Sequence, residues 1–198
     1  MNKKGVLIVI SGFSGVGKGT VVKKLIEKYH YSLSVSATTR EPRPGEVDGK
    51  DYFFTDENGL EQIRQSGRLI ELRSYNTAHG IWNYFTVDDG QVDLKSHDYL
   101  LIGTLESYGA MRSYYGSDVM VPVLVEVPDG IRLQRALDRE KSQDQPKYAE
   151  MCRRFLADTE DFQEEKIEAA GIGAEDRFEN DSFEGCLEKI RRHIRGKM

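Results

Sequence analysis

The stretch VLIVISGFSGVGKGTVVKKLIEKY, residues 6–29, decides the fold class. Residues 6–10 form a continuous apolar run, which predicts a strand buried on both faces of a parallel sheet. Beyond the glycines, apolar residues recur at helical spacing, at Val21, Val22, Leu25 and Ile26. A strand, a glycine-rich turn and an amphipathic helix in this order predict a phosphate-binding loop in an α/β domain.

The glycines of this loop suit anion binding. They let backbone N–H groups turn toward a phosphate without side-chain clashes, and the positive end of the following helix faces the same space. Lys18 is placed to reach the β- and γ-phosphates of a nucleotide. The loop departs from the common GxxxxGKS/T pattern because Gly19 follows the lysine, which leaves Thr20 as the candidate magnesium ligand. The predicted nucleotide-binding loop comprises Gly12, Phe13, Ser14, Gly15, Val16, Gly17, Lys18, Gly19 and Thr20.

Length and composition predict one globular domain. The 198 residues are 38% apolar and 31% charged, and they contain no apolar run long enough for a membrane span, so we expect no membrane partner. The formal net charge of −5 disfavours a nucleic-acid-binding protein that works through a broad basic face. Cys152 and Cys186 have no metal-site spacing, and free thiols in a cytoplasmic protein are the expectation.

A second stretch, SATTREPRPGEVDGKDYFF at residues 36–54, indicates a second anion site. Arg40 and Arg43 lie three positions apart around Pro42, and the prolines restrict the backbone, so the two guanidinium groups can converge on one phosphate. Tyr52 adds a hydroxyl donor. A GTPase is expected to carry an Asn/Thr-Lys-x-Asp element, and the segments NYFT and ENDS lack its Lys-x-Asp. The two anion sites therefore favour a kinase of small molecules over a GTPase.

Together with GRLIE, RALDR, RRF and END further along the chain, these stretches resemble the guanylate kinases, P-loop nucleoside monophosphate kinases that transfer phosphate from ATP to GMP. The resemblance covers nearly the whole chain in the expected order. It implies ATP and Mg2+ as cofactors, GMP or dGMP as the acceptor, and a monomer or homodimer. Two alternatives stay open: a P-loop kinase of the same fold that acts on another small phosphate acceptor, and a non-catalytic guanylate-kinase-like module that binds a phosphorylated ligand.

The resemblance assigns the acceptor site residue by residue. Arg40, Arg43 and Tyr52 look like the ligands of the GMP phosphate. Ser36 looks like the residue that contacts the guanine carbonyl oxygen, and Glu71 like the carboxylate that accepts from the ring N–H and the amino group. Guanine presents donors at N1 and N2, whereas adenine presents an acceptor at N1, so a carboxylate here favours guanine.

The segment after Glu71 departs from the family pattern. Where a Tyr-Gly-Thr or Tyr-Gly-Ser element is usual, the chain reads NTAHGIWNYFT, residues 76–86. His79 stands at the expected tyrosine and Ile81 at the expected hydroxyl residue. The GMP phosphate is then expected to receive a bond from His79, or from Tyr84 in a shifted position, and a purely structural histidine is the third reading.

A second departure follows the predicted strand 99–102. The family normally continues with an Asp-x-Asp pair that supports the base and the magnesium ion, whereas this chain reads GTLE. Thr104 and Glu106 are the polar stand-ins, and Thr104 is the predicted substrate contact. Guanine recognition is therefore expected to rest on fewer residues than is usual in the family.

The last third of the chain carries further cations. A strand at 119–127 precedes an amphipathic helix from about 129, and the polar stretch EKSQDQPKY suits a mobile lid. By resemblance Arg135, Arg139 and Arg154 act with Lys18 on the transferred phosphoryl group. Asn180 looks like the family's residue near adenine, although a capping role at the start of the last helix would also explain it.

The predicted architecture is a single domain over residues 1–198. It has a P-loop NTPase-type parallel sheet of about five strands flanked by helices, an inserted mixed α/β GMP-binding subdomain and a small lid. The core is expected at residues 1–33, 96–139 and 156–198, the insertion at 34–95 and the lid at 140–155.

Overall fold

The computed structural model describes residues 4–43, 45–77 and 80–198. Within these ranges the main sheet is five-stranded and parallel, with the strand order β2-β7-β1-β8-β9. The predicted fold class is confirmed. The strands are β1 Leu7–Ser11, β2 Ser32–Leu33, β7 Tyr99–Ile102, β8 Met120–Glu126 and β9 Arg177–Glu179.

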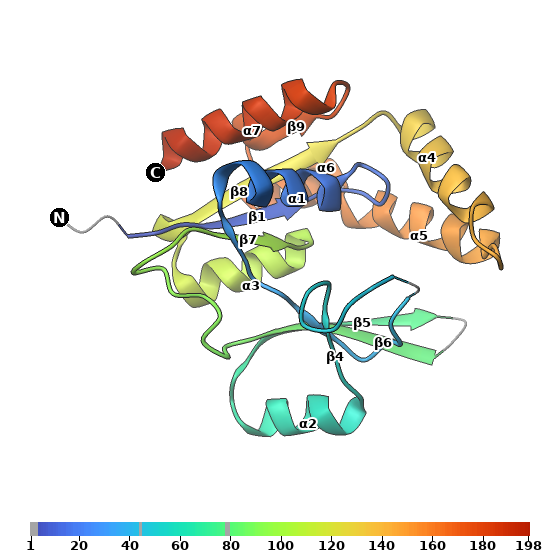
Figure 1. Ribbon diagram of the computed structural model, residues 1–198, viewed down its shortest axis with the longest axis horizontal. Coiled ribbons are helices and arrows are strands. Elements are labelled where there is room, and N and C mark those ends of the chain that lie inside the picture. The colour runs from blue at the N-terminus through green and yellow to red at the C-terminus, as the bar shows by residue number, and fades with distance from the viewer. Residues whose placement is uncertain (1–3, 44, 78–79) are drawn as a thin grey trace.

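Helices cover both faces of this sheet (Figure 1). Alternate residues of β1 point to opposite faces: Ile8 and Ile10 pack with α1 and α7, and Leu7 and Val9 pack with α3 and α6. Because neither face meets water, each of these strand residues is apolar and buried, as the sequence pattern predicts. The helices are α1 Lys18–Tyr29, α3 Leu105–Tyr115, α6 Glu164–Ala169 and α7 Phe183–Lys197.

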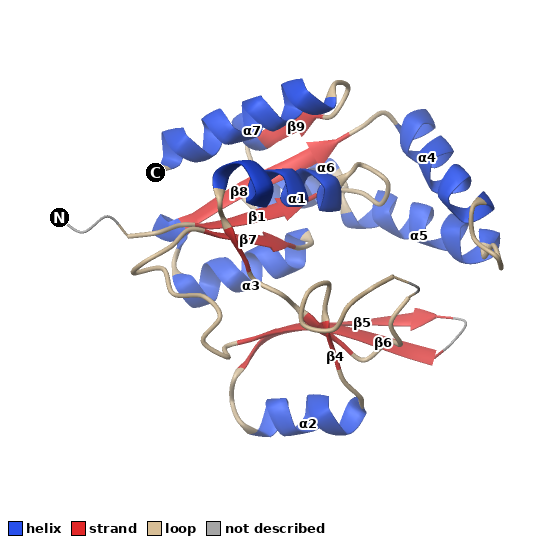
Figure 2. Ribbon diagram, in the orientation of Figure 1, coloured by secondary structure: helices blue, strands red, loops and turns tan. Residues whose placement is uncertain are grey.

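A separate mixed sheet lies beside the main one (Figure 2). Among the described residues it has four strands in the order β4-β3-β6-β5, with β5 and β6 forming an antiparallel hairpin. Its small hydrophobic core includes Phe85 of the sheet and Leu60 of α2, the helix that covers one face of this sheet. The elements are β3 Ala37–Thr38, β4 Phe53–Phe54, α2 Glu57–Gln65, β5 Leu69–Thr77 and β6 Gly80–Val87.

Two further helices flank the end of the main sheet where the strands finish. These are α4 Asp129–Lys141 and α5 Tyr148–Asp161, and they are joined by residues 142–147. The polar stretch of the predicted lid is thus the α4–α5 connection together with the ends of both helices. The predicted lid movement and the domain limits stay predictions.

The start of α7 corrects one expectation. The helix begins at Phe183 after Ser182, so Asn180 does not cap it. Asn180 is instead buried beside the phosphate loop. Cys152 is exposed and Cys186 is buried, and both are free thiols.

In the described part of the chain, none of the helices has an apolar run that would reach across a bilayer.

Candidate functional site

The turn between β1 and α1 forms the predicted phosphate loop. Gly15 and Gly17 adopt φ angles of 87° and 95°, a backbone conformation that residues other than glycine rarely adopt. The Lys18 ammonium folds back over the loop and donates to the carbonyl oxygens of Gly12 and Phe13, at 2.6 and 2.9 Å. The loop is therefore closed around the site that a phosphate would occupy, with the lysine at its rim.

Buried contacts hold the loop in place. The Asn180 side-chain amide donates to the Val16 carbonyl at 2.8 Å, and a Cβ on Gly17 would lie 3.0 Å from the same amide nitrogen. Phe13 packs against Phe162, with ring centroids 4.9 Å apart. The side chains of Phe13 and Val16 thus brace the loop from inside and do not line either cavity described below, so any part they play in nucleotide binding is through their backbone.

A carboxylate that the sequence did not single out lies against the loop. Asp158, on α5, accepts a hydrogen bond from the backbone N–H of Ser14. Burial lowers the pKa of Lys18 to about 8; the negative charge of Asp158 opposes this shift, and Arg154 and Arg139 add to it. The loop therefore already holds one anionic group, and an incoming phosphate has to share or replace it.

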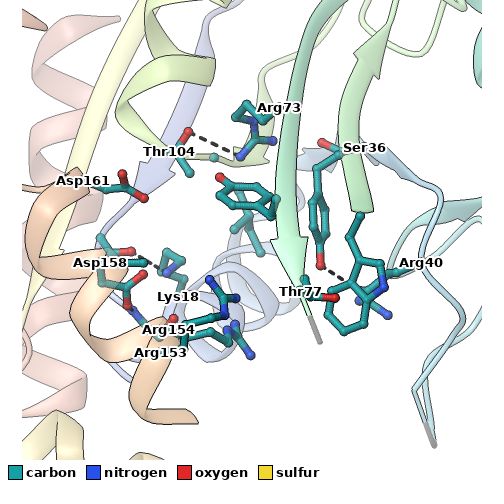
Figure 3. Close-up of a pocket in the computed structure, with 18 of the residues that line it drawn as sticks. Lys18, Ser36, Arg40, Arg73, Thr77, Thr104, Arg153, Arg154, Asp158 and Asp161 are labelled. Carbon is teal, nitrogen blue, oxygen red and sulfur yellow. Dashed lines mark hydrogen bonds between the residues drawn. The ribbon is translucent and has the colours of Figure 1, made fainter. Parts of the chain in front are cut away.

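Two cavities meet at this loop. The first, which we call the loop cavity, is lined by Ser14, Gly15, Gly17, Lys18, Gly19, Thr20, Arg135, Arg139, Arg154, Asn180, Asp181 and Phe183. The second, the sheet cavity, extends from the loop to the four-stranded sheet, and α5 forms one of its walls (Figure 3). Ser14, Lys18 and Arg154 line both. A group bound in one cavity is therefore close to the same cations as a group bound in the other.

Arg40 and Arg43 lie at one end of the sheet cavity, and Arg40 is paired with a carboxylate. Arg40 is only 3% exposed, and its two terminal nitrogens donate to the Glu46 carboxylate at 2.6 and 2.7 Å. Its Nε donates to the Tyr84 hydroxyl at 3.0 Å, and its guanidinium carbon lies 5.0 Å from the centroid of the Tyr52 ring. Glu46 was not evident from the sequence, although it fixes the orientation of Arg40.

Arg43 is more open than Arg40. It is exposed at the cavity, and desolvation together with the charges of Arg40 and Arg154 lowers its pKa. Its backbone N–H also donates to Glu46, at 2.8 Å. Tyr52 and Tyr84 lie edge to face at 5.7 Å and line the same cavity. The residues predicted to bind one phosphate are therefore gathered at one place.

A polar cluster occupies the other end of this cavity, away from Arg40 and Arg43, where the pairing of β5 with β6 places Glu71 opposite Thr86. Thr86 donates to Glu71 at 3.0 Å and lies 3.5 Å from the Ser36 hydroxyl. Arg73 donates to Glu71 through Nε and Nη2, at 2.9 and 3.2 Å, and to Thr104 through Nη1, at 3.3 Å. Arg73 lines the cavity, whereas Glu71 lies behind it.

Comparison with known proteins identifies the family. A family model described as guanylate kinase matches residues 4–81. A guanylate kinase from Trichormus variabilis is 31% identical over 192 residues, which cover 94% of this chain and 87% of the relative. The chain belongs to the guanylate kinase family. Relatives from Lactobacillus acidophilus and Lactococcus lactis are 42% and 38% identical over shorter segments, and the chain spans about half of their length, 47% and 58%.

The fold of the guanylate kinase family is seen in a solved structure as well. A guanylate kinase from Anaplasma phagocytophilum superposes with a TM-score of 0.68 over 98% of this chain and 87% of the other, at 20% sequence identity. The shared features are thus the parallel sheet, the separate mixed sheet and their order along the chain. The family resemblance noted in the sequence is confirmed.

One departure from the guanylate kinase pattern lies at a different residue from the one that the sequence indicated. Ile81 is 59% exposed near the turn of the β5–β6 hairpin, so it does not stand in for the family's hydroxyl residue. Thr86 supplies a hydroxyl beside Glu71 instead, and Tyr84 two positions earlier lines the cavity. The signal in the sequence was the Tyr-x-Thr spacing within NYFT. The predicted role of His79 lies outside the described residues.

At the other departure from the family pattern, only one of the two predicted polar stand-ins, Thr104, lies at the sheet cavity. Thr104 caps α3 by accepting from the backbone N–H of Ser107, and it also meets Arg73. Glu106 is exposed on α3 and does not line the sheet cavity. At the place of the family's Asp-x-Asp pair the structure therefore has Thr104, which Arg73 contacts from β5, and Arg73 had no recognisable signal in the sequence.

Proposed function

We propose that this chain transfers the γ-phosphate of ATP to GMP, giving ADP and GDP. One observation carries the proposal: Lys18 and Arg154 line both the loop cavity and the sheet cavity. A donor phosphate in the first cavity and an acceptor phosphate in the second would meet over these two cations. Phosphoryl transfer needs this arrangement because charge on the transferred group has to be neutralised while both partners are held in line.

ATP would occupy the loop cavity. The loop N–H groups and Lys18 would bind its phosphates, Arg135 and Arg139 of α4 would approach from the opposite side, and Asn180 would lie near the adenine. Thr20 also lines this cavity, and its hydroxyl is the proposed protein ligand of Mg2+. In the described residues no group of three His, Cys, Asp or Glu is placed to hold a metal ion. ATP phosphates and water would complete the shell, as is common for Mg2+, which would supply further positive charge.

GMP would place its phosphate among Arg40, Arg43, Tyr52 and Tyr84. A general base is not needed, because the second pKa of a phosphate monoester is about 6 and the attacking oxygen is already ionised at neutral pH. The chain then acts by position and electrostatics. The α4–α5 segment is proposed to bring Arg154 over the transferred group and to exclude water from it.

A coupled assay of ADP release tests this proposal. ATP and magnesium are supplied with GMP, dGMP, AMP, CMP or UMP in parallel, and turnover is expected with GMP and dGMP alone. Arg73 covers Glu71, which the family resemblance assigns to guanine, so sugar phosphates form a second arm that tests the alternative of a kinase acting on another small phosphate. Turnover with a sugar phosphate but with no nucleotide would replace GMP as the acceptor. ATP binding without any turnover would favour a binding module.

A further inference from the structure

The guanidinium of Arg73 stands between the sheet cavity and the carboxylate of Glu71. Both residues lie on β5, two positions apart, so their side chains leave the same face of the strand. The two side chains are 10% and 4% exposed. Burial opposes the charge of Arg73, but the attraction of Glu71 and the hydrogen bonds to Glu71 and Tyr75 outweigh it and raise the pKa of Arg73. Arg73 therefore keeps its positive charge at neutral pH.

The hydrogen bonds of this pair determine what it can offer a ligand. Glu71 accepts two bonds from Arg73 and one from Thr86, so both of its oxygens are engaged. Arg73 has five N–H groups, and its bonds to Glu71 and Thr104 use three of them. The bonds to Glu71 and Thr104 leave one N–H on Nη1 and one on Nη2 at the cavity, where the Tyr75 hydroxyl also bonds to Arg73 and a bound base would take the place of that hydroxyl. The far wall of the cavity thus presents donors, and the acceptor lies behind them.

We propose that Arg73 reads the guanine base by donating to O6 and N7, and that Glu71 is a positioning residue that holds the guanidinium in place. This inference rests on the proposed function, because it concerns how GMP is recognised. Guanine carries two adjacent acceptors on this edge, and a bidentate arginine contact matches them. Adenine places a donor at the position of O6, and pyrimidines have no N7, so the same fork disfavours the other nucleotides.

Direct reading of guanine by Glu71, as the sequence suggests, demands a costlier rearrangement. The base would have to displace Arg73 from Glu71 and leave a largely buried guanidinium without its carboxylate. Reading through Arg73 leaves the pair intact. The two modes also depend on different atoms of the base: N7 matters only to Arg73, and the 2-amino group only to Glu71.

Two nucleotide analogues separate these modes in the unmodified protein. 7-Deaza-GMP replaces N7 by C–H, and IMP lacks the 2-amino group. Dissociation constants of GMP and both analogues are measured by calorimetry, and turnover is measured in parallel. We expect 7-deaza-GMP to bind about 5- to 100-fold more weakly than GMP, because the fork loses one acceptor, and IMP to bind within about 3-fold of GMP. Equal binding of GMP and 7-deaza-GMP would overturn the inference, whatever IMP does.

Two variants give a second readout. Arg73→Lys keeps the charge beside Glu71 but loses the fork, so GMP binding should weaken about 10-fold and its advantage over 7-deaza-GMP should nearly vanish. Arg68→Lys, on an exposed arginine of the same sheet region, is the control and should retain both. An undiminished preference for N7 in Arg73→Lys overturns the inference. N7-dependent binding without turnover would refute the proposed function alone, and turnover of GMP without N7 dependence would refute this inference alone.

Discussion

Arg40 and Arg43 are three residues apart and look equivalent in the sequence, but the structure predicts that their removal has different effects. Arg40 is buried and bonded twice to Glu46, whereas Arg43 is exposed and, among the described residues, its side chain joins no ion pair. We expect Arg40→Ala to lower stability and Arg43→Ala to lower GMP affinity alone. The comparison separates a residue that organises the phosphate site from one that supplies charge to it.

The size of the first effect follows from Glu46. Removing one partner of a buried ion pair costs about 3–5 kcal/mol. The Glu46 side chain is 18% exposed and keeps the bond from the Arg43 backbone, so we expect a smaller loss of about 2 kcal/mol. For a chain of this size that loss corresponds to a Tm lower by about 4–8 °C. GMP affinity should fall as well, because Arg40 lines the cavity.

The effect of Arg43→Ala is on binding. An exposed side chain without an ion pair contributes about 0.5 kcal/mol or less to stability, so Tm should be unchanged. A hydrogen bond between charged groups contributes about 1.5–3 kcal/mol, which corresponds to a KM for GMP raised about 10- to 100-fold. The KM for ATP should stay the same, because ATP is proposed to bind in the loop cavity, which Arg43 does not line.

Thermal unfolding and steady-state kinetics with each substrate varied in turn provide the test. Arg68→Ala is the control, because Arg68 is exposed and bonds through its side chain to Ser66. A rise in both KM values by the same factor in Arg43→Ala would refute the division into two sites. A Tm of Arg40→Ala equal to that of the control would refute the organising role of the Arg40–Glu46 pair.

Three further predictions concern the loop and the polar cluster. Burial lowers the pKa of Lys18 to about 8, so the lysine is protonated below that pH. The kcat/KM for ATP should therefore decline as the pH rises from 7 to 9, and a flat pH profile would contradict this prediction. Asp158→Asn removes the negative charge bonded to the Ser14 N–H, so ATP should bind about 3- to 10-fold more tightly, as measured by calorimetry. Weaker binding would show that the carboxylate of Asp158 assists nucleotide binding. Thr86→Val removes a donor to Glu71 and should cost about 1 kcal/mol in denaturant unfolding, whereas an unchanged midpoint would mean that the bond contributes nothing.

The fold could be predicted because its signals are local. The apolar run at the start of the chain, the glycine loop and the periodic helix after it all lie within about 25 residues, and each has one reading in a parallel sheet. The later strand β7 lies at 99–102, as its apolar run predicts. The gathering of Arg40, Arg43 and Tyr52 at one cavity was also predictable, because they lie in one short, restricted segment, and their role as phosphate ligands stays a prediction.

The base end of the cavity could not be predicted in the same way, because it depends on strand register. Glu71 and Thr86 become neighbours only through the β5–β6 pairing, which contains an irregularity between Leu69 and Glu71. A slip of one residue would move every side chain of a strand to the other face. The length of the β5–β6 hairpin was not evident from the sequence either, which is why the position of the expected hydroxyl residue was assigned to Ile81, whereas the hydroxyl beside Glu71 belongs to Thr86.

The two ends of the sheet cavity differ in charge, and this difference suits the two halves of a nucleotide. At the base end Glu71 neutralises Arg73, which leaves directed donors without net charge, and a neutral base needs no more. At the phosphate end Arg43 has no such partner among the described residues, which leaves a positive charge for an anion. Salt screens exposed charges far more than buried hydrogen bonds. Raising the salt concentration should therefore weaken the binding of GMP and 7-deaza-GMP by the same factor. If the ratio of their dissociation constants changed with salt, base recognition would depend on screened charges as well.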